Sequence, residues 1–91
     1  MRYNTVGEFV QSFADEGQEE SLWDMIDDYK EWKREGHIGD CLLRSNAQVF
    51  CSNLKIPLQY HTEYMEKIAM GIYEYFALRY KELKRFESYC S

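Results

Sequence analysis

The longest unbroken pattern in this chain is its last third, which limits the possible folds more than any other feature. From Thr62 to about Ser88, apolar residues recur at three- and four-residue steps, and Gly71 is the one interruption. A helix of this length would be about 40 Å long, whereas a globule of 91 residues is about 30 Å across. The helix must therefore bend near Gly71, or extend from the body and be covered by a second copy.

Two shorter helices are predicted in the first 36 residues. Thr5 and Glu8 have the spacing of a capping box, which begins a helix that should end near Gly17. The second helix is expected to begin at Gln18 or Ser21 and to end at Gly36.

A third helix is expected from Asp40, a good N-cap, to about Asn53, and Ile56-Pro57 should then break the chain. Val and Thr together number only five, which disfavours a sheet. A chain of this length also holds one core of useful size rather than two. The sequence thus predicts an all-α fold, a small four-helix bundle with a long C-terminal helix, as a single helical domain over residues 1–91.

The second predicted helix has an acidic face. At about 100° per residue, six carboxylates fall within about 100° of arc, opposite the apolar residues of the same helix. Like charges at these spacings oppose helix formation by roughly 0.2–0.5 kcal/mol per pair, so an organised anionic surface costs stability. The row of carboxylates is therefore either a surface that binds a partner or an outer face that is only solvated. We call it the acidic face, and its members are Glu20, Asp24, Asp27, Asp28, Glu31 and Glu35.

Charge is divided unevenly along the chain. Residues 1–40 hold eleven acids and four bases, a net −7, whereas residues 41–91 hold five acids and seven bases, a net +2. An acidic surface repels nucleic acids and anionic membranes, so we expect neither as a direct partner. A basic protein surface, such as that of a nucleic-acid-binding protein, is the expected partner.

A cluster of bases near the C-terminus is of the kind that contacts nucleic acid. Its members are Arg79, Lys81, Lys84 and Arg85. They are few against sixteen acids, and the helix dipole favours cations in the last turns of a helix in any case. A helix-turn-helix formed by the second and third helices is disfavoured, because its reading face would lack basic and amide side chains.

Neither a metal nor a cofactor is expected. Four ligand types occur at His37, Cys41, Cys51 and His61, but their spacing matches no compact zinc-binding pair. The sequence contains no nucleotide-binding, metalloprotease or hydrolase motif. Cys41 or Cys51 with His61 could form a nucleophile and base, yet no local signature supports this pair. We therefore expect no catalytic residues and a protein that is not an enzyme.

The three cysteines, an odd number without a CxxC pair, are typical of a reduced compartment. The first 13 residues lack the apolar core of a signal peptide, and no stretch is long enough to cross a bilayer. We expect a cytoplasmic protein.

In size and charge, though in no motif, the chain resembles small acidic bacteriophage proteins that block restriction or CRISPR enzymes. The acidic face itself leads us to the hypothesis of an inhibitor that occupies a basic nucleic-acid-binding groove, with the acidic face in place of phosphates and Trp23 or Trp32 as an anchor at its edge. The alternative is a self-associating structural or regulatory helical protein whose acidic face is only solvated surface. Its homodimer interface would lie on the last helix, at Tyr73, Phe76, Tyr80 and Leu83.

Overall fold

The computed structural model describes residues 3–90 of the chain, with side chains as far as Lys81. The elements are α1 (Val6–Asp15), α2 (Glu19–Glu35), α3 (Leu42–Asn53), a short 3-10 helix η1 (Leu58–Tyr60) and α4 (His61–Cys90). Residues 3–90 contain no strand, so the predicted all-α four-helix fold with a long C-terminal helix is confirmed. Within the part of the chain that the structure describes, no helix is long and apolar enough to cross a membrane.

The residues predicted to begin α1 and to end α2 do so in the structure. The Thr5 side chain accepts a hydrogen bond from the backbone amide of Glu8 at 3.2 Å, which caps α1. Gly36 ends α2 in the left-handed conformation, with φ of 83°, where its amide donates to the carbonyl of Trp32 at 2.8 Å.

The start of α3 differs from the prediction. The helix begins at Leu42 after Cys41, so Asp40 is not its N-cap, and the Cys41 side chain makes no capping hydrogen bond. The capping acceptor is instead Asp28 of α2, whose Oδ2 receives the amide of Leu43 at 3.0 Å. A carboxylate from a neighbouring helix thus replaces the expected local cap, which sequence spacing alone does not indicate.

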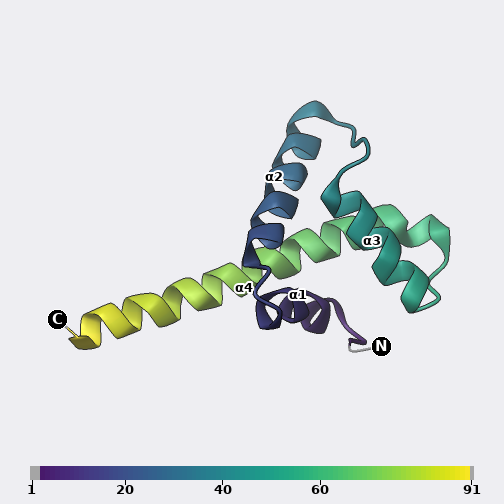
Figure 1. Cartoon of the computed structure of the whole chain (residues 1–91). Coiled ribbons are helices and arrows are strands. Elements are labelled where there is room, and N and C mark those ends of the chain that lie inside the picture. The colour runs from purple at the N-terminus through teal and green to yellow at the C-terminus, as the bar shows by residue number, and fades with distance from the viewer. Residues whose placement is uncertain (1–2, 91) are drawn as a thin grey trace.

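Helix α4 is one continuous helix of 30 residues that is not broken at Gly71. A Cβ atom at Gly71 would lie 2.9 Å from Cγ1 of Val6, so the glycine lets α1 cross close to α4. The helix is extended, as in the second of the two arrangements that the sequence allowed, and its cover by a second copy stays a prediction. Figure 1 shows the C-terminal part of α4 extending away from the other helices.

Helix α4 is the central element and packs against α1, α2 and α3. The third helix buries Leu43, Ala47 and Phe50, whereas Leu54 directly after it is only half-buried. The buried hydrophobic side chains form one core, and its members are Phe9, Val10, Leu22, Met25, Ile26, Leu43, Ala47, Phe50, Cys51, Met65, Ile68 and Ile72.

Candidate functional site

The acidic face lies on a single continuous helix, α2, as the sequence predicts. Leu22, Met25 and Ile26 point into the core from the opposite side of that helix. Burial of this apolar side turns the carboxylates outward. The members that are exposed to solvent are Glu20, Asp24, Asp27, Glu31 and Glu35.

Asp28, the sixth member, is half-buried and contributes to the fold. Its carboxylate accepts the Leu43 amide at the start of α3, where the helix dipole also favours a negative charge. Together with burial, which is the larger cause, the nearby Asp28 carboxylate raises the pKa of the Cys41 thiol. Asp28 therefore links α2 to α3 and is less available to a partner than its neighbours.

Little of the acidic face is neutralised by bases of the same chain. Glu35 pairs with the adjacent Arg34 at 3.4 Å, in an exposed contact of the kind that contributes little to stability. Within the described part of the chain, the remaining exposed acids have no ion pair or side-chain hydrogen bond. These are Glu20, Asp24, Asp27 and Glu31.

The two tryptophans flank the acidic face on opposite edges, as their positions in the helical register require. Trp23 is 52% exposed, and one face of its indole stacks on Phe76 of α4 with ring centroids 3.9 Å apart. Trp32 is half-buried, and Nζ of Lys33 lies 4.6 Å from its ring centroid. Trp23 is therefore the tryptophan that presents more of its surface to a partner.

A hollow of about 200 Å³ adjoins the C-terminal half of the acidic face. Asp28, Glu31 and Glu35 line it from α2, and Asp40 adds a carboxylate from the loop before α3. His37 and Cys41 also line this hollow, yet among the described residues no group of three or more His, Cys, Asp or Glu could hold a metal ion. The hollow enlarges the anionic surface beyond α2 itself.

A polar cluster fastens α2 to α4 next to the acidic face. The Tyr29 hydroxyl donates to Oε1 of Glu66 at 2.8 Å, and Nζ of Lys33 lies 2.8 Å from Oε2 of the same carboxylate. The hydrogen bonds from Lys33 and Tyr29 lower the pKa of Glu66. Burial, followed by the hydrogen bond and the charge of Glu66, raises the pKa of Tyr29 to about 12. Lys33 is therefore committed to Glu66 and does not neutralise the acidic face.

Cys51 and His61 line one hollow at the end of α3, but their surroundings do not suit a nucleophile and its base. Burial raises the pKa of the Cys51 thiol, which favours the unreactive protonated form. His61 is itself buried, and its Nε2 lies 3.2 Å from the carbonyl oxygen of Arg44.

The residues predicted for a dimer interface have different surroundings. Tyr73 and Tyr80 are exposed, although Tyr73 also approaches Tyr29 with ring centroids 6.1 Å apart. Phe76 is half-buried and stacks on Trp23. The Leu83 side chain lies outside the described residues.

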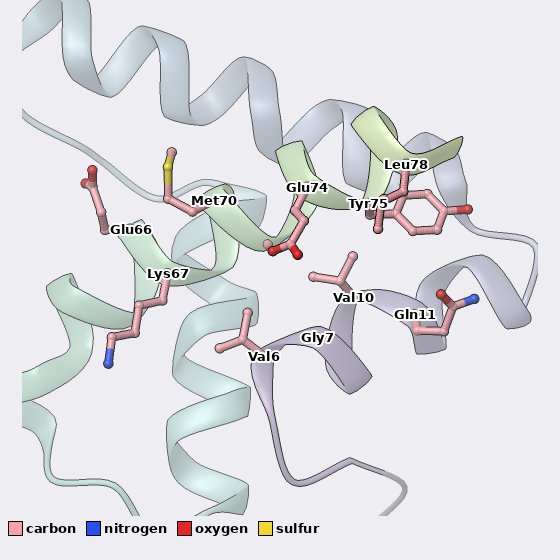
Figure 2. A pocket seen from close by; sticks show the side chains of 11 residues that line it. Val6, Gly7, Val10, Gln11, Glu66, Lys67, Met70, Glu74, Tyr75 and Leu78 are labelled. Carbon is pink, nitrogen blue, oxygen red and sulfur yellow. The ribbon is translucent and has the colours of Figure 1, made fainter. Parts of the chain in front are cut away.

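A groove between α1 and α4 was not expected from the sequence. Val6 and Val10 line it from α1, and Met70 and Leu78 line it from α4 (Figure 2). The sequence did contain an indication of this groove. Met70 and Leu78 are eight residues apart and lie on one side of the helix, away from the apolar residues that face the core. We call this feature the α1–α4 groove.

Comparison of the chain with protein-family models, with curated proteins and with solved structures gives no significant match. Its function must therefore be inferred from the surfaces described above.

Proposed function

We propose that this chain is a non-enzymatic protein-binding module, an inhibitor that occupies the basic nucleic-acid-binding groove of a target protein. The acidic face of α2 takes the place of the phosphates, and the exposed Trp23 contacts the edge of the target groove. The observation that carries this proposal is the row of exposed carboxylates on one continuous helix. Most of these carboxylates have no basic partner within the described residues.

The dimensions of the acidic face support the proposal. Glu20 and Glu35 are fifteen residues apart on one helix, which corresponds to a row of charge about 22 Å long. Successive exposed carboxylates along this row are three or four residues apart, which is about 4.5–6 Å of helix rise. A groove that binds a nucleic-acid strand places Lys and Arg side chains along a similar line of negative charge.

The repulsion among the carboxylates of α2 also supports a basic partner. Repulsion among the carboxylates opposes the helix by about 1–3 kcal/mol in sum, at roughly 0.2–0.5 kcal/mol per pair. A row of Lys and Arg side chains on a target would remove this repulsion and replace it with attraction. Part of the affinity for the target would thus come from removing the carboxylate repulsion that is present in the free protein.

The test is a charge reversal on the acidic face. The variant Asp24→Lys/Asp27→Lys/Glu31→Lys changes three exposed residues without described partners, so its helical content should stay intact. Proteins captured from a host lysate by the wild-type chain at low salt should be released by duplex DNA or by single-stranded RNA. The captured protein, once purified, should bind the wild-type chain and not the variant, and its affinity should fall as salt screens the charges.

A matched control carries the same change of net charge on other helices. The variant Asp15→Lys/Glu63→Lys/Glu74→Lys alters three exposed acids of α1 and α4 and should retain target binding. If the α2 variant binds as tightly as the wild-type chain, or if both variants lose binding equally, the acidic face is only solvated surface and the proposal is wrong.

A further inference from the structure

The hollow at the end of α3 is bounded by α3, by η1 and by the first residue of α4, and has a volume of about 510 Å³. We call it the α3–η1 hollow. Sites for small molecules usually have about 300–1,000 Å³. Among the described residues, those that line it include no Asp, Glu, Lys or Arg. By contrast, Glu66, Lys67 and Glu74 line the α1–α4 groove (Figure 2). The α3–η1 hollow therefore suits an uncharged ligand.

One wall of the α3–η1 hollow is apolar. Val49 of α3 is 48% exposed and Leu58 of η1 is 77% exposed. Ile56 lines the hollow between them, and its amide donates to the carbonyl of Cys51 at 2.8 Å, which closes the end of α3. Burial raises the pKa of the Cys51 thiol, so this lining residue also stays uncharged. The fold thus presents an apolar contact surface inside the hollow.

The polar feature of the hollow is His61, which lines it from the first turn of α4 and is only 8% exposed. Its Nε2 lies 3.2 Å from the carbonyl oxygen of Arg44. A carbonyl oxygen can only accept a hydrogen bond, so Nε2 carries the proton in this contact. In the neutral imidazole, Nδ1 is then an acceptor.

Nδ1 of His61 has no hydrogen-bond partner among the residues that the structure describes. In the same part of the chain, no fully enclosed side-chain nitrogen or oxygen lacks a partner. Nδ1 is therefore not fully enclosed, and the hollow that His61 lines is its route to the outside. A nearly buried acceptor without a partner is unfavourable, so a ligand in the hollow gains affinity if it donates a hydrogen bond there.

We propose that the α3–η1 hollow binds a small uncharged molecule that has an apolar body and donates a hydrogen bond to Nδ1 of His61. Val49 and Leu58 contact the apolar body of this molecule. The exposed side chains of Gln48 and Ser52, which also line the hollow, can bond to any further polar group. The hollow shares no residue with the acidic face, so this binding does not depend on the proposed inhibitory function.

The first experiment titrates the full chain with indole, whose N–H donates a hydrogen bond and cannot accept one. Amide NMR signals of Cys51 and Ile56 should shift, with a dissociation constant of about 1 mM or below. The isomer 3-methylindole keeps the donor and should bind about as tightly. The isomer 1-methylindole lacks it and should bind about three- to tenfold more weakly, the effect of one neutral hydrogen bond. Equal affinities of the two isomers, or no binding of indole at millimolar concentration, would overturn the proposal.

A second measurement follows the ¹⁵N signal of Nδ1 itself. It should shift with indole and 3-methylindole and stay in place with 1-methylindole, whereas a purely structural role of His61 would give no such difference. An Nδ1 signal that does not respond to indole would contradict the proposed hydrogen bond.

A pair of variants tests the position of the ligand. Val49→Glu places a charge in the hollow and should weaken indole binding by at least about tenfold. Ser45→Glu is the matched control, since Ser45 is exposed one turn away on α3 and does not line the hollow. Circular dichroism should show the same helical content for both variants. If both bind indole as tightly as the wild-type chain, indole binds elsewhere and the proposal is wrong.

Discussion

The indole of Trp23 stacks on the ring of Phe76, with ring centroids 3.9 Å apart and planes inclined by 19°. In the hypotheses drawn from the sequence, these residues belong to two separate interfaces, Trp23 to one for a target and Phe76 to one for a second copy. Their contact joins the first turns of α2 to α4. Near it, Arg79 of α4 pairs with Glu19 of α2 at 3.3 Å. One face of Trp23 is thus used by the fold, while its exposed surface remains open to a partner.

Trp23→Ala should destabilise the protein by about 1–3 kcal/mol, because it removes the aromatic stack and part of the apolar cover of Phe76. Trp23→Tyr retains an aromatic face and should lose less than half of that amount. Urea denaturation followed by circular dichroism measures both variants. If Trp23→Ala has the stability of the wild-type chain, the stack does not form in solution.

Asp28→Ala should destabilise the protein by about 0.5–2 kcal/mol, the usual effect of losing a helix cap. The physical reason is that the Leu43 amide, which donates to Asp28 at 3.0 Å, would lose its acceptor. Asp27→Ala is the matched control, since Asp27 is exposed and has no described partner. Equal stabilities of the two variants in chemical denaturation would show that Asp28 does not cap α3.

Gly71→Ala should destabilise the protein by about 1–3 kcal/mol, the cost of overpacking, although alanine favours a helix by about 1 kcal/mol over glycine. The added methyl group would lie 2.9 Å from Cγ1 of Val6, a β-branched side chain with little freedom to move. In Gly7→Ala the nearest described atom is Oγ1 of Thr5 at 3.9 Å, so only the gain in helix propensity should appear. Thermal denaturation compares the two. A stabilised Gly71→Ala variant would mean that α1 does not cross α4 this closely.

The hydrogen bond from Tyr29 to Glu66 should make stability depend on pH at the alkaline end. The pKa of Tyr29 is raised from 10.0 to about 12 in the folded state, so the folded protein retains a proton that the unfolded chain loses. The advantage of the wild-type chain over Tyr29→Phe, about 0.5–1.5 kcal/mol for one hydrogen bond, should therefore be complete below pH 10 and be lost as pH approaches 12. Denaturation of both chains at several pH values measures this difference, and a constant difference over that window would contradict the assignment.

Glu66 should give a dependence of the opposite sign at the acid end. Its pKa is lowered from 4.5 by Lys33 and Tyr29, so its contribution is complete above pH 4.5 and is lost as pH falls further. Glu66→Gln should be less stable than the wild-type chain by up to about 1 kcal/mol at neutral pH. The free energies of unfolding of the two chains should become equal at acidic pH. If the gap between them widens on acidification, the pKa of Glu66 is not lowered.

Four features of the protein could be predicted from its sequence: the helices, the cap at Thr5, the end of α2 at Gly36 and the segregation of acids from apolar residues on α2. These features depend on interactions within a few residues, which periodicity and cap chemistry record directly. It also showed that the last helix is too long for the body, but not whether it bends. Other features depend on how the helices pack: α4 is continuous, Gly71 lets α1 cross closely, Asp28 caps α3 and Trp23 stacks on Phe76. Each of these contacts joins residues far apart in the chain, and their positions follow from how the helices pack around α4, which local spacing does not encode.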